Sequence, residues 1–455
     1  APVYPYADCR TPNRRLFTLT QIAGPQTGAC LPLRRLQDTK QAPVYPYADC
    51  RTPNRRLFTP TQIAGRQTGA CLPLHKLQDA KQAPVYPYAG LCRGRGSLSW
   101  YPPNFAAPAG ALFGIALTFA GMKKILITGA SGFIGGHLVR EALEGGYEVW
   151  AGVRQSSSLG RLPKDRVHLI DLRYADAEAL AAQVREHAAE HGRWDGVVHN
   201  AGVTKTVRPA DFFEVNTEYT RRLLAALNAG GQTTRPDRFV LMSSLSAFGR
   251  GDERTFRPIS ADDEPRPESI YGRSKLAAEQ CVREQTTIPY TILRPTGVYG
   301  PGDRDYGMEI ESIRAGFDFK IGRTPQRLTF IYARDLARVV RLALERPEAV
   351  GRSYFVADGD VYTDDEFAGL IQELLHRRHV LHARIPLWLA RVVCTVSEAI
   401  GRMTGRPATL NTDKYHILKQ RNWICDVSPL RHELGFTPEY NLRRGLEEII
   451  AETNH

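Results

Sequence analysis

Methionine is scarce in this sequence, with four residues in 455 and none before Met122. Residues 1–41 and 42–82 are near-copies of each other, and a third copy begins at Ala83 and soon breaks off. The copies are rich in proline, glycine and threonine and lack the apolar spacing of a helix or strand, so they cannot bury a core. We therefore expect residues 1–121 to be a disordered leader, or translated sequence upstream of a start at Met122.

Long apolar runs are scarce as well. The stretch Ala109–Gly121 has 13 mostly apolar residues, which is too short to cross a bilayer. It has the length of a signal-peptide core but lies far from the N-terminus, where such a core belongs. We therefore expect no membrane insertion, no export and a cytoplasmic location.

Cysteine and excess charge are largely confined to residues 1–121, which hold five of the eight cysteines and 10 of the 12 net positive charges. The remaining Cys281, Cys394 and Cys425 are widely spaced, which predicts neither a disulfide framework nor a metal site. They indicate a reducing compartment. From Met122 onward the chain has 46 basic and 44 acidic residues, and this balance predicts no nucleic-acid partner.

A short apolar strand leads directly into a glycine-spaced turn at residues 124–135, KILITGASGFIG. Gly129, Gly132 and Gly135 then open a predicted helix. Glycines allow the tight turn and let a pyrophosphate approach the backbone, with the helix N-terminus directed at the phosphates. Because both the strand and the helix are present, the turn predicts a dinucleotide site.

Strands and helices alternate after this turn, which predicts an α/β fold with a Rossmann-type, doubly wound parallel sheet. The predicted strands are 124–128, 147–153, 166–171, 195–199, 238–243 and 290–294. The predicted helices between them are 133–144, 176–189, 211–228 and 269–286.

After residue 300 the pattern becomes less regular and more helical. Short strands are predicted near 328–332 and 353–356, and helices at 334–346, 363–376, 386–404 and 441–452. We expect a dinucleotide-binding domain over residues 122–300 and a smaller, mostly helical substrate lobe over 301–455, partly interleaved with it.

Tyr271 and Lys275 form a second chemical signal. They lie four residues apart on a predicted helix, so the phenol and the ammonium share one face. A positive charge beside a tyrosine favours the phenolate and lowers its pKa, about 10 when unperturbed, toward a value useful for proton transfer. Ser243 and Ser244 follow a predicted strand at its carboxyl end, where ligands of open α/β sheets bind.

From Met122 onward the sequence resembles the extended short-chain dehydrogenases/reductases, a group of NAD-dependent epimerases and dehydratases with hydroxysteroid dehydrogenase-like and dihydroflavonol reductase-like members. The matching segments follow the family's order. They are TGASGFIG (128–135), VVHNAG (197–202), VNTEYTRRLLAA (215–226), SSLSAFG (243–249), YGRSK (271–275), LRPTGVYGPGD (293–303), FIYARDLARVV (330–340) and WICDVSPLRHELGFTPEYNLRRGLEEII (423–450).

This resemblance implies that Ser244, Tyr271 and Lys275 are catalytic, with Asn216 supporting the site. It also implies a homodimer and a nicotinamide dinucleotide. The cofactor-binding residues that it implies, besides Tyr271 and Lys275, are Gly129, Ser131, Gly132, Phe133, Ile134, Gly135, Arg154, Asp171, Leu172, Asn200, Ala201, Gly202 and Pro295.

The end of the second strand bears on the choice of cofactor. A carboxylate there would bind the ribose 2′-hydroxyl of NAD, whereas an arginine accommodates the 2′-phosphate of NADP. This strand ends in AGVRQSS with Arg154 and no acid, and a guanidinium suits a phosphate. We predict NADP over NAD.

Two segments bear on the substrate class. Nucleotide-sugar members of the resembled family carry an asparagine just before Val-Tyr-Gly, and this chain has Gly297 there. The segment 386–404 has an apolar face that could wall an apolar pocket or serve core or dimer packing. We predict an oxidoreductase that transfers hydride at a carbonyl or hydroxyl carbon of a small substrate, which is apolar if the face of 386–404 walls the pocket. The alternatives are a nucleotide-sugar epimerase or dehydratase that recycles its cofactor, and a non-catalytic NADP sensor.

Overall fold

The computed structural model divides into two units, residues 1–109 and 110–455. It describes residues 93–94, 97–98, 123–285 and 287–453. In the first unit, β1 (Arg93–Gly94) and β2 (Ser97–Leu98) pair antiparallel. Apart from these four residues, the predicted leader lies outside the described residues. We call the second unit the main unit.

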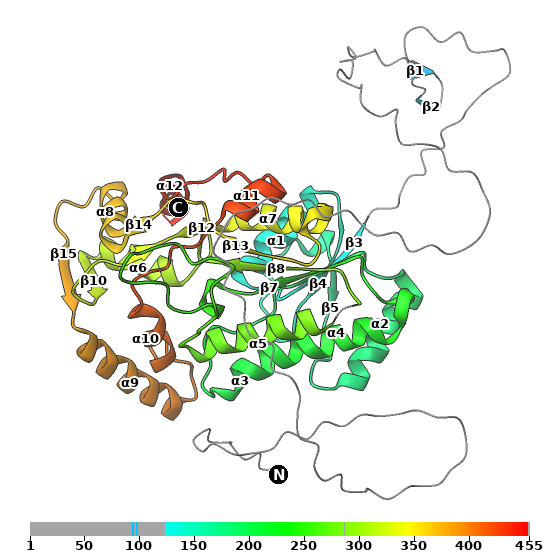
Figure 1. Ribbon diagram of the computed structural model, residues 1–455, viewed down its shortest axis with the longest axis horizontal. Helices are drawn as coiled ribbons and strands as arrows, with labels where there is room; N and C mark the ends of the chain where they lie inside the picture. Colours follow the sequence, from blue (N-terminus) through cyan, green and yellow to red (C-terminus); the bar gives the residue numbers. More distant parts are fainter. Residues whose placement is uncertain (1–92, 95–96, 99–122, 286, 454–455) are drawn as a thin grey trace, which may run out of the picture. The chain divides into compact units, whose positions relative to one another are not determined.

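A seven-stranded parallel sheet forms the centre of the main unit (Figure 1). Its order is β13-β8-β7-β6-β3-β4-β5, and the order reverses between β3 and β6. This is the doubly wound topology, so the predicted fold class is confirmed. The strands are β3 (Lys124–Thr128), β4 (Glu148–Gly152), β5 (His168–Ile170), β6 (Gly196–His199), β7 (Arg238–Met242), β8 (Tyr290–Pro295) and β13 (Arg352–Val356).

Helices cover both faces of this sheet (Figure 1). One face carries α1 (Phe133–Glu144) and α7 (Ala333–Glu345). The other face carries α2 (Ala177–His191), α4 (Tyr219–Ala229) and α5 (Ile270–Glu284). Two buried layers therefore enclose the sheet, as expected for strands that are apolar on both sides.

The first strand shows how the sequence builds these layers. Ile125 and Ile127 of β3 pack in the layer with α1 and α7, whereas Leu126 packs in the layer with α2, α4 and α5. Side chains alternate between the faces of a strand, so the apolar run Ile-Leu-Ile fills both layers at once. All three side chains are buried, which fixes the register of the strand that leads into the glycine turn.

The remaining elements form the part of the main unit that lies beyond the sheet. Three small strand pairs occur there: β9 with β12 and β10 with β15, both parallel, and β11 with β14, antiparallel. The strands are β9 (Gly297–Tyr299), β10 (Phe317–Ile321), β11 (Arg327–Leu328), β12 (Phe330–Tyr332), β14 (Tyr362–Thr363) and β15 (Leu381–Ile385). The helices are α6 (Asp305–Arg314), α8 (Asp364–Leu374), α9 (Leu387–Thr404), α10 (Thr412–Leu418) and α12 (Leu442–Thr453). Helix α11 (Ser428–Leu434) packs instead on the face of the central sheet that carries α1 and α7.

Three predicted segments have a more specific arrangement in the structure, and elements such as β10, β15 and α6 were not predicted. The predicted helix 211–228 is α3 (Ala210–Phe213), a π-helical turn (Glu214–Glu218) and then α4. The predicted strand 328–332 is split into β11 and β12, which pair with different partners. The strand near 353–356 completes the central sheet as β13, in the part of the chain where interleaving was expected.

Candidate active site

The glycine turn connects β3 to α1 and passes close to the end of β6. Gly129 has a φ of +64°, and a Cβ on it would lie 2.9 Å from the Cα of Ala201. A Cβ on Gly135 would lie 2.2 Å from the carbonyl oxygen of Gly129. Both positions therefore require glycine, one for backbone conformation and close approach and the other for packing of the helix against the turn.

Gly132 has a different environment. It is the N-cap of α1, it is exposed, and no side chain caps the helix there. A Cβ on Gly132 would meet only the carbonyl oxygen of Gly129, at 3.2 Å. Protein atoms thus leave this side of the helix N-terminus open, which fits a bound pyrophosphate. Ser131, Phe133 and Ile134 flank the same turn and are partly exposed.

Thr128 holds the ends of β3 and β6 together. Its hydroxyl oxygen accepts hydrogen bonds from the backbone amides of Asn200 and Ala201, at 3.1 and 3.0 Å. The Asn200 side chain donates to the carbonyl of Gly129 at 3.4 Å. The predicted cofactor residues of these two strand ends therefore lie together at the carboxyl edge of the sheet, at its switch point.

Gly202 borders the predicted catalytic group. A Cβ on Gly202 would lie 2.9 Å from the Asn216 Oδ1 and 3.0 Å from the Lys275 Nζ. Asn216 is buried on the π-helical turn, where its Nδ2 donates to the Ser274 Oγ at 2.9 Å. Such turns are rare and occur often at functional sites. Side chains from α5 and the π-helical turn thus meet at one point.

Ser244 and Tyr271 come from different elements. Ser244 is the N-cap of a 3₁₀ turn after β7, where its Oγ accepts from the Ser246 amide at 3.1 Å. Tyr271 lies in the first turn of α5, and its phenol is close enough to the Ser244 side chain for the serine to lower the pKa of the phenol. The structure therefore places Asn216 with Lys275, and Ser244 with Tyr271, at the carboxyl edge of the sheet.

The electrostatics differ from the prediction. Burial raises the pKa of Tyr271, and the Ser244 side chain only partly opposes this. Burial also lowers the pKa of Lys275 to about 8, and its Nζ donates to the Met242 carbonyl at 2.9 Å. Lys275 is not among the groups that shift the Tyr271 pKa, so the expected lowering by its charge is not found in this geometry.

The remaining predicted residues occupy neighbouring strand ends. Arg154 is exposed after β4, and the adjacent Gln155 amide donates to the Asp171 carboxylate at 3.1 Å. Leu172 is buried beside it, and Pro295 is buried at the end of β8. Asp171 thus stabilises the turn that carries Arg154.

Two contacts of this site were not foreseen from the sequence. Glu279 is fully buried one helical turn after Lys275. The sequence does contain a signal for this contact, because a carboxylate four residues after a lysine lies on the same face of a helix. Asp413 accepts hydrogen bonds from the backbone amides of Ile270 and Tyr271. It lies more than 140 residues away in the chain, and no sequence pattern connects it to α5.

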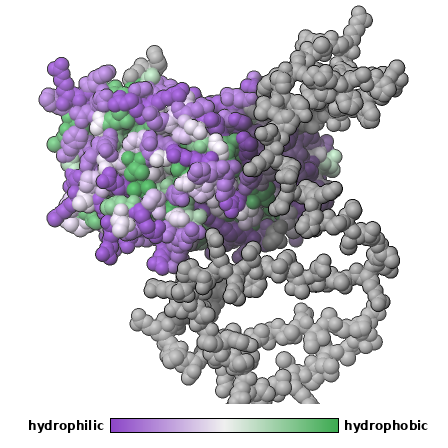
Figure 2. Space-filling model, turned by 45° about the horizontal axis from the view of Figure 1, so that its top comes forward, coloured by the Kyte–Doolittle hydropathy of each residue, from purple (hydrophilic) through white to green (hydrophobic). Residues whose placement is uncertain are grey.

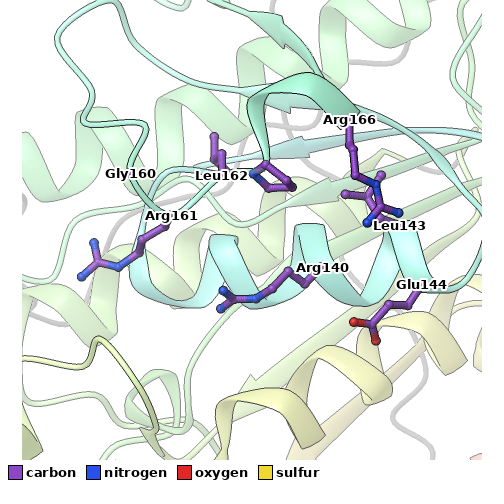
Figure 3. Close-up of a pocket in the computed structure, with 8 residues that line it drawn as sticks. Arg140, Leu143, Glu144, Gly160, Arg161, Leu162 and Arg166 are labelled. Atoms are coloured by element: carbon purple, nitrogen blue, oxygen red, sulfur yellow. The ribbon is translucent and has the colours of Figure 1, made fainter. Parts of the chain in front are cut away.

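A hollow of about 360 Å³ lies elsewhere, on the outer side of α1 (Figure 3). Its basic side chains come from Arg140 on α1 and from Arg161 and Arg166 on the segment between β4 and β5. None of the predicted catalytic or cofactor residues lines it, and we assign it no part in the site.

Residues 125–357 match the sequence model of the NAD dependent epimerase/dehydratase family. The chain belongs to this family. A 3 beta-hydroxysteroid dehydrogenase/Delta 5→4-isomerase of Mycobacterium tuberculosis is 28% identical over 346 residues, covering 72% of this chain and 90% of that protein. A UDP-glucose 4-epimerase of Vibrio cholerae is 26% identical over 345 residues, covering 72% of this chain and 94% of that protein.

A solved structure of MoeE5 in complex with UDP-glucuronic acid and NAD superposes with a TM-score of 0.56 at 26% identity. It covers 73% of this chain and 99% of that one. The protein is therefore an enzyme of the extended short-chain dehydrogenase/reductase type that uses a nicotinamide dinucleotide. The family and the enzyme class that the sequence predicted are confirmed.

Proposed function

We propose that this enzyme reduces a carbonyl, or oxidises the corresponding hydroxyl, on a small apolar substrate with NADP. The observation that carries the proposal is that the Ser244 side chain acts on the phenol of Tyr271, while the buried Lys275 and Asn216 meet beside Gly202. Two hydroxyl groups on different elements can bind one reacting oxygen from two sides, which is the arrangement that polarises a carbonyl.

In the reductive direction the Ser244 hydroxyl would hydrogen-bond the substrate oxygen, and the Tyr271 phenol would donate its proton to it. When bound, the nicotinamide supplies the hydride to the carbonyl carbon. The raised pKa of Tyr271 supports this direction, because burial keeps the phenol protonated and ready to act as an acid. Oxidation of the alcohol is the reverse, with the phenolate accepting the proton.

Lys275 and Asn216 would position the reacting groups. The Lys275 Nζ would hold the nicotinamide ribose, and the space beside Gly202 is lined by that Nζ and the Asn216 amide. Asn216 is held from both sides, because its amide also pairs with the backbone of Val203 at 2.8 and 3.1 Å. The pyrophosphate would lie at Gly132, on the open side of the α1 N-terminus.

Arg154 supports the preference for NADP. Its side chain is exposed, and among the described residues it forms no ion pair. The nearby Asp171 carboxylate accepts from the Gln155 amide. An available guanidinium at the end of β4 suits a 2′-phosphate.

Gly297 bears on the substrate. A Cβ at this position would lie 2.2 Å from the hydroxyl oxygen of Tyr306 and 3.2 Å from the Phe330 ring. An asparagine, as in the nucleotide-sugar members that the sequence resembles, would therefore not fit without movement of Tyr306. Aromatic side chains occupy the space where a diphosphate contact would be made, which favours an apolar substrate.

A panel of ketones and alcohols, including steroid and flavonoid carbonyls, tests the proposal with purified full-length protein. We expect stoichiometric consumption of NADPH with one substrate class. If the cofactor stays bound while a nucleotide sugar changes configuration, the enzyme is an epimerase. Cofactor binding with no turnover on either class would favour a sensor.

We also propose a homodimer, as the family resemblance implies, and a cytoplasmic location, where the cofactor pool is found. Sedimentation velocity of the purified protein tests the dimer, and fractionation of the native host tests the location.

A further inference from the structure

Helix α9 presents an exposed apolar face at the outer edge of the main unit (Figure 1). Trp388, Val392, Val396, Ile400 and Met403 follow one another at intervals of three or four residues, so they form a single stripe along the helix. All five are exposed, Trp388 by 68% and Met403 by 87%. The alternative that this face fills the core is therefore wrong for this stripe.

The opposite side of α9 is the one that packs. Ala390, Cys394 and Gly401 are buried, and α9 contacts α10. A helix with small buried residues and large exposed apolar ones has the reverse of the usual arrangement for a surface helix. By contrast, the face of the main unit visible in Figure 2 is mostly hydrophilic, with separate apolar patches.

The strand pair next to α9 is exposed and apolar too. Leu381 on β15, the strand that runs directly into α9, is exposed, as are Phe317 and Phe319 on its partner β10. The two phenylalanine rings stack with centroids 5.9 Å apart. We call these residues and the α9 stripe together the apolar edge.

Positive charge accompanies the apolar edge. Residues 376–408 contain six arginines and one acid, Glu398, which is already hydrogen-bonded to Arg402 and Thr412. Among the described residues, Arg378, Arg391 and Arg406 form no ion pair. All three are exposed, so their charges are available to an external partner.

We propose that the apolar edge docks on the surface of an anionic lipid bilayer. An amphipathic helix that carries Trp and aliphatic side chains beside arginines lies in the plane of such a surface. It binds through burial of its apolar side chains and through attraction of its arginines to the anionic headgroups. Among the described residues no helix is long and apolar enough to cross a membrane, so the contact is peripheral. A second copy of the chain is a poorer occupant, because a twofold contact would bring the same arginines together.

Co-sedimentation of the full-length protein with vesicles tests this proposal. Vesicles of phosphatidylcholine alone are compared with vesicles that also contain about 30 mol% phosphatidylglycerol. Residues 1–121 carry a net charge of +10 and could bind the anionic vesicles themselves, so matched variants of the full chain decide the result.

One variant, Trp388→Ser/Val392→Ser/Ile400→Ser, removes apolar groups, and a second, Arg391→Glu/Arg406→Glu, reverses charge. The control Val350→Ser/Val361→Ser replaces exposed valines on other elements. We expect both test variants to lose at least about tenfold in affinity for anionic vesicles, and the control to bind as the original chain does.

The melting temperature and cofactor affinity of each variant establish that it is folded. If the triple serine variant does not fold, the Arg391→Glu/Arg406→Glu variant decides alone. Both arginines are exposed, so their replacement should not disturb the fold. Unchanged vesicle binding of a folded test variant would overturn the proposal. So would loss of a dimer in the serine variant without vesicles, which would identify the apolar edge as a contact between copies.

Discussion

Glu279 lies one helical turn after Lys275 on α5, and its carboxylate raises the pKa of the ammonium that burial lowers to about 8. The carboxylate itself is bound by Arg294 at 2.8 and 2.9 Å and by the Ser243 hydroxyl at 2.6 Å. Arg294 thereby holds the pKa of Glu279 below its usual range despite burial. A buried charge pair between α5 and β8 thus supports the buried lysine next to the reacting groups.

Replacing Lys275 with Met should stabilise the protein at pH 7 by about 2–3 kcal/mol, while it abolishes turnover and weakens cofactor binding. Below about pH 8 Lys275 is protonated in both the folded and the unfolded chain, so the full free-energy cost of burying its charged ammonium is present. Between about pH 8 and 10.5 only the unfolded chain holds it, so the original protein gains stability relative to the variant. Urea unfolding at several pH values measures this difference. The exposed Lys164→Met is the control, and a flat difference for Lys275→Met would contradict the shifted pKa.

Tyr271→Phe should reduce turnover by about a hundred- to ten-thousand-fold and leave cofactor affinity nearly unchanged, because the ring still packs while the proton donor is gone. Steady-state kinetics on the substrate found in the panel measure the loss. Tyr147→Phe, which removes a phenol bonded to Glu345 at 3.2 Å, should keep full activity. A Tyr271→Phe enzyme with more than roughly a tenth of the original rate would show that the phenol is not the acid.

Gly132→Val should abolish cofactor binding without unfolding the chain, because its Cβ would meet only one protein atom within 4 Å but would fill the space at the helix N-terminus. Gly135→Val should instead lower the stability of the fold, since its Cβ would lie 2.2 Å from a backbone oxygen. Calorimetric titration with NADPH and thermal unfolding separate the two effects. Retained affinity in Gly132→Val would show that the turn does not hold the pyrophosphate.

Gly297→Asn should destabilise the protein by about 1–3 kcal/mol through overpacking against Tyr306. Gly307→Asn is the matched control, because a Cβ there meets nothing within 4 Å. Adding Tyr306→Ala to Gly297→Asn should recover part of the loss by opening the space. Urea unfolding measures all three, and equal stability of the two single variants would refute the clash.

Arg154→Ala should weaken NADPH binding by about 1.5–3 kcal/mol, the scale for losing a charged hydrogen bond, and leave NADH binding little changed. Arg173→Ala, another exposed arginine on a neighbouring loop, is the control. Titration with both cofactors gives the comparison. Equal losses for NADPH and NADH would mean that Arg154 does not contact the 2′-phosphate.

The central sheet could be predicted because each of its inner strands is a short apolar run bounded by turn residues. The predicted strand 124–128 and helix 133–144 coincide with β3 and α1. Short elements beyond residue 300 could not be predicted. For example, α10 has seven residues and β14 two, which is too little chain to show a period, and long-range pairing fixes them.

In the candidate site, too, local features could be predicted and long-range contacts could not. Local spacing predicted the Tyr271–Lys275 pair, since both residues lie on one helix. The sequence could not predict the sign of the pKa shift of Tyr271, because burial depends on how α5 packs against other elements. Nor could it connect Asp413 to the first turn of α5, where a carboxylate at the helix N-terminus stabilises the free amides.

The π-helical turn at Glu214–Glu218 also makes the site sensitive to insertions and deletions. Its hydrogen bonds span one residue more than those of an α-helix, so deleting one residue there would let the helix close in the ordinary way. Side chains before and after the deletion would then rotate relative to each other by about 100°. Asn216 would lose its contacts with Val203 and Ser274. In an alignment of homologues, a one-residue gap at this turn would therefore mark proteins that have lost this asparagine's position, even where the residue itself is retained.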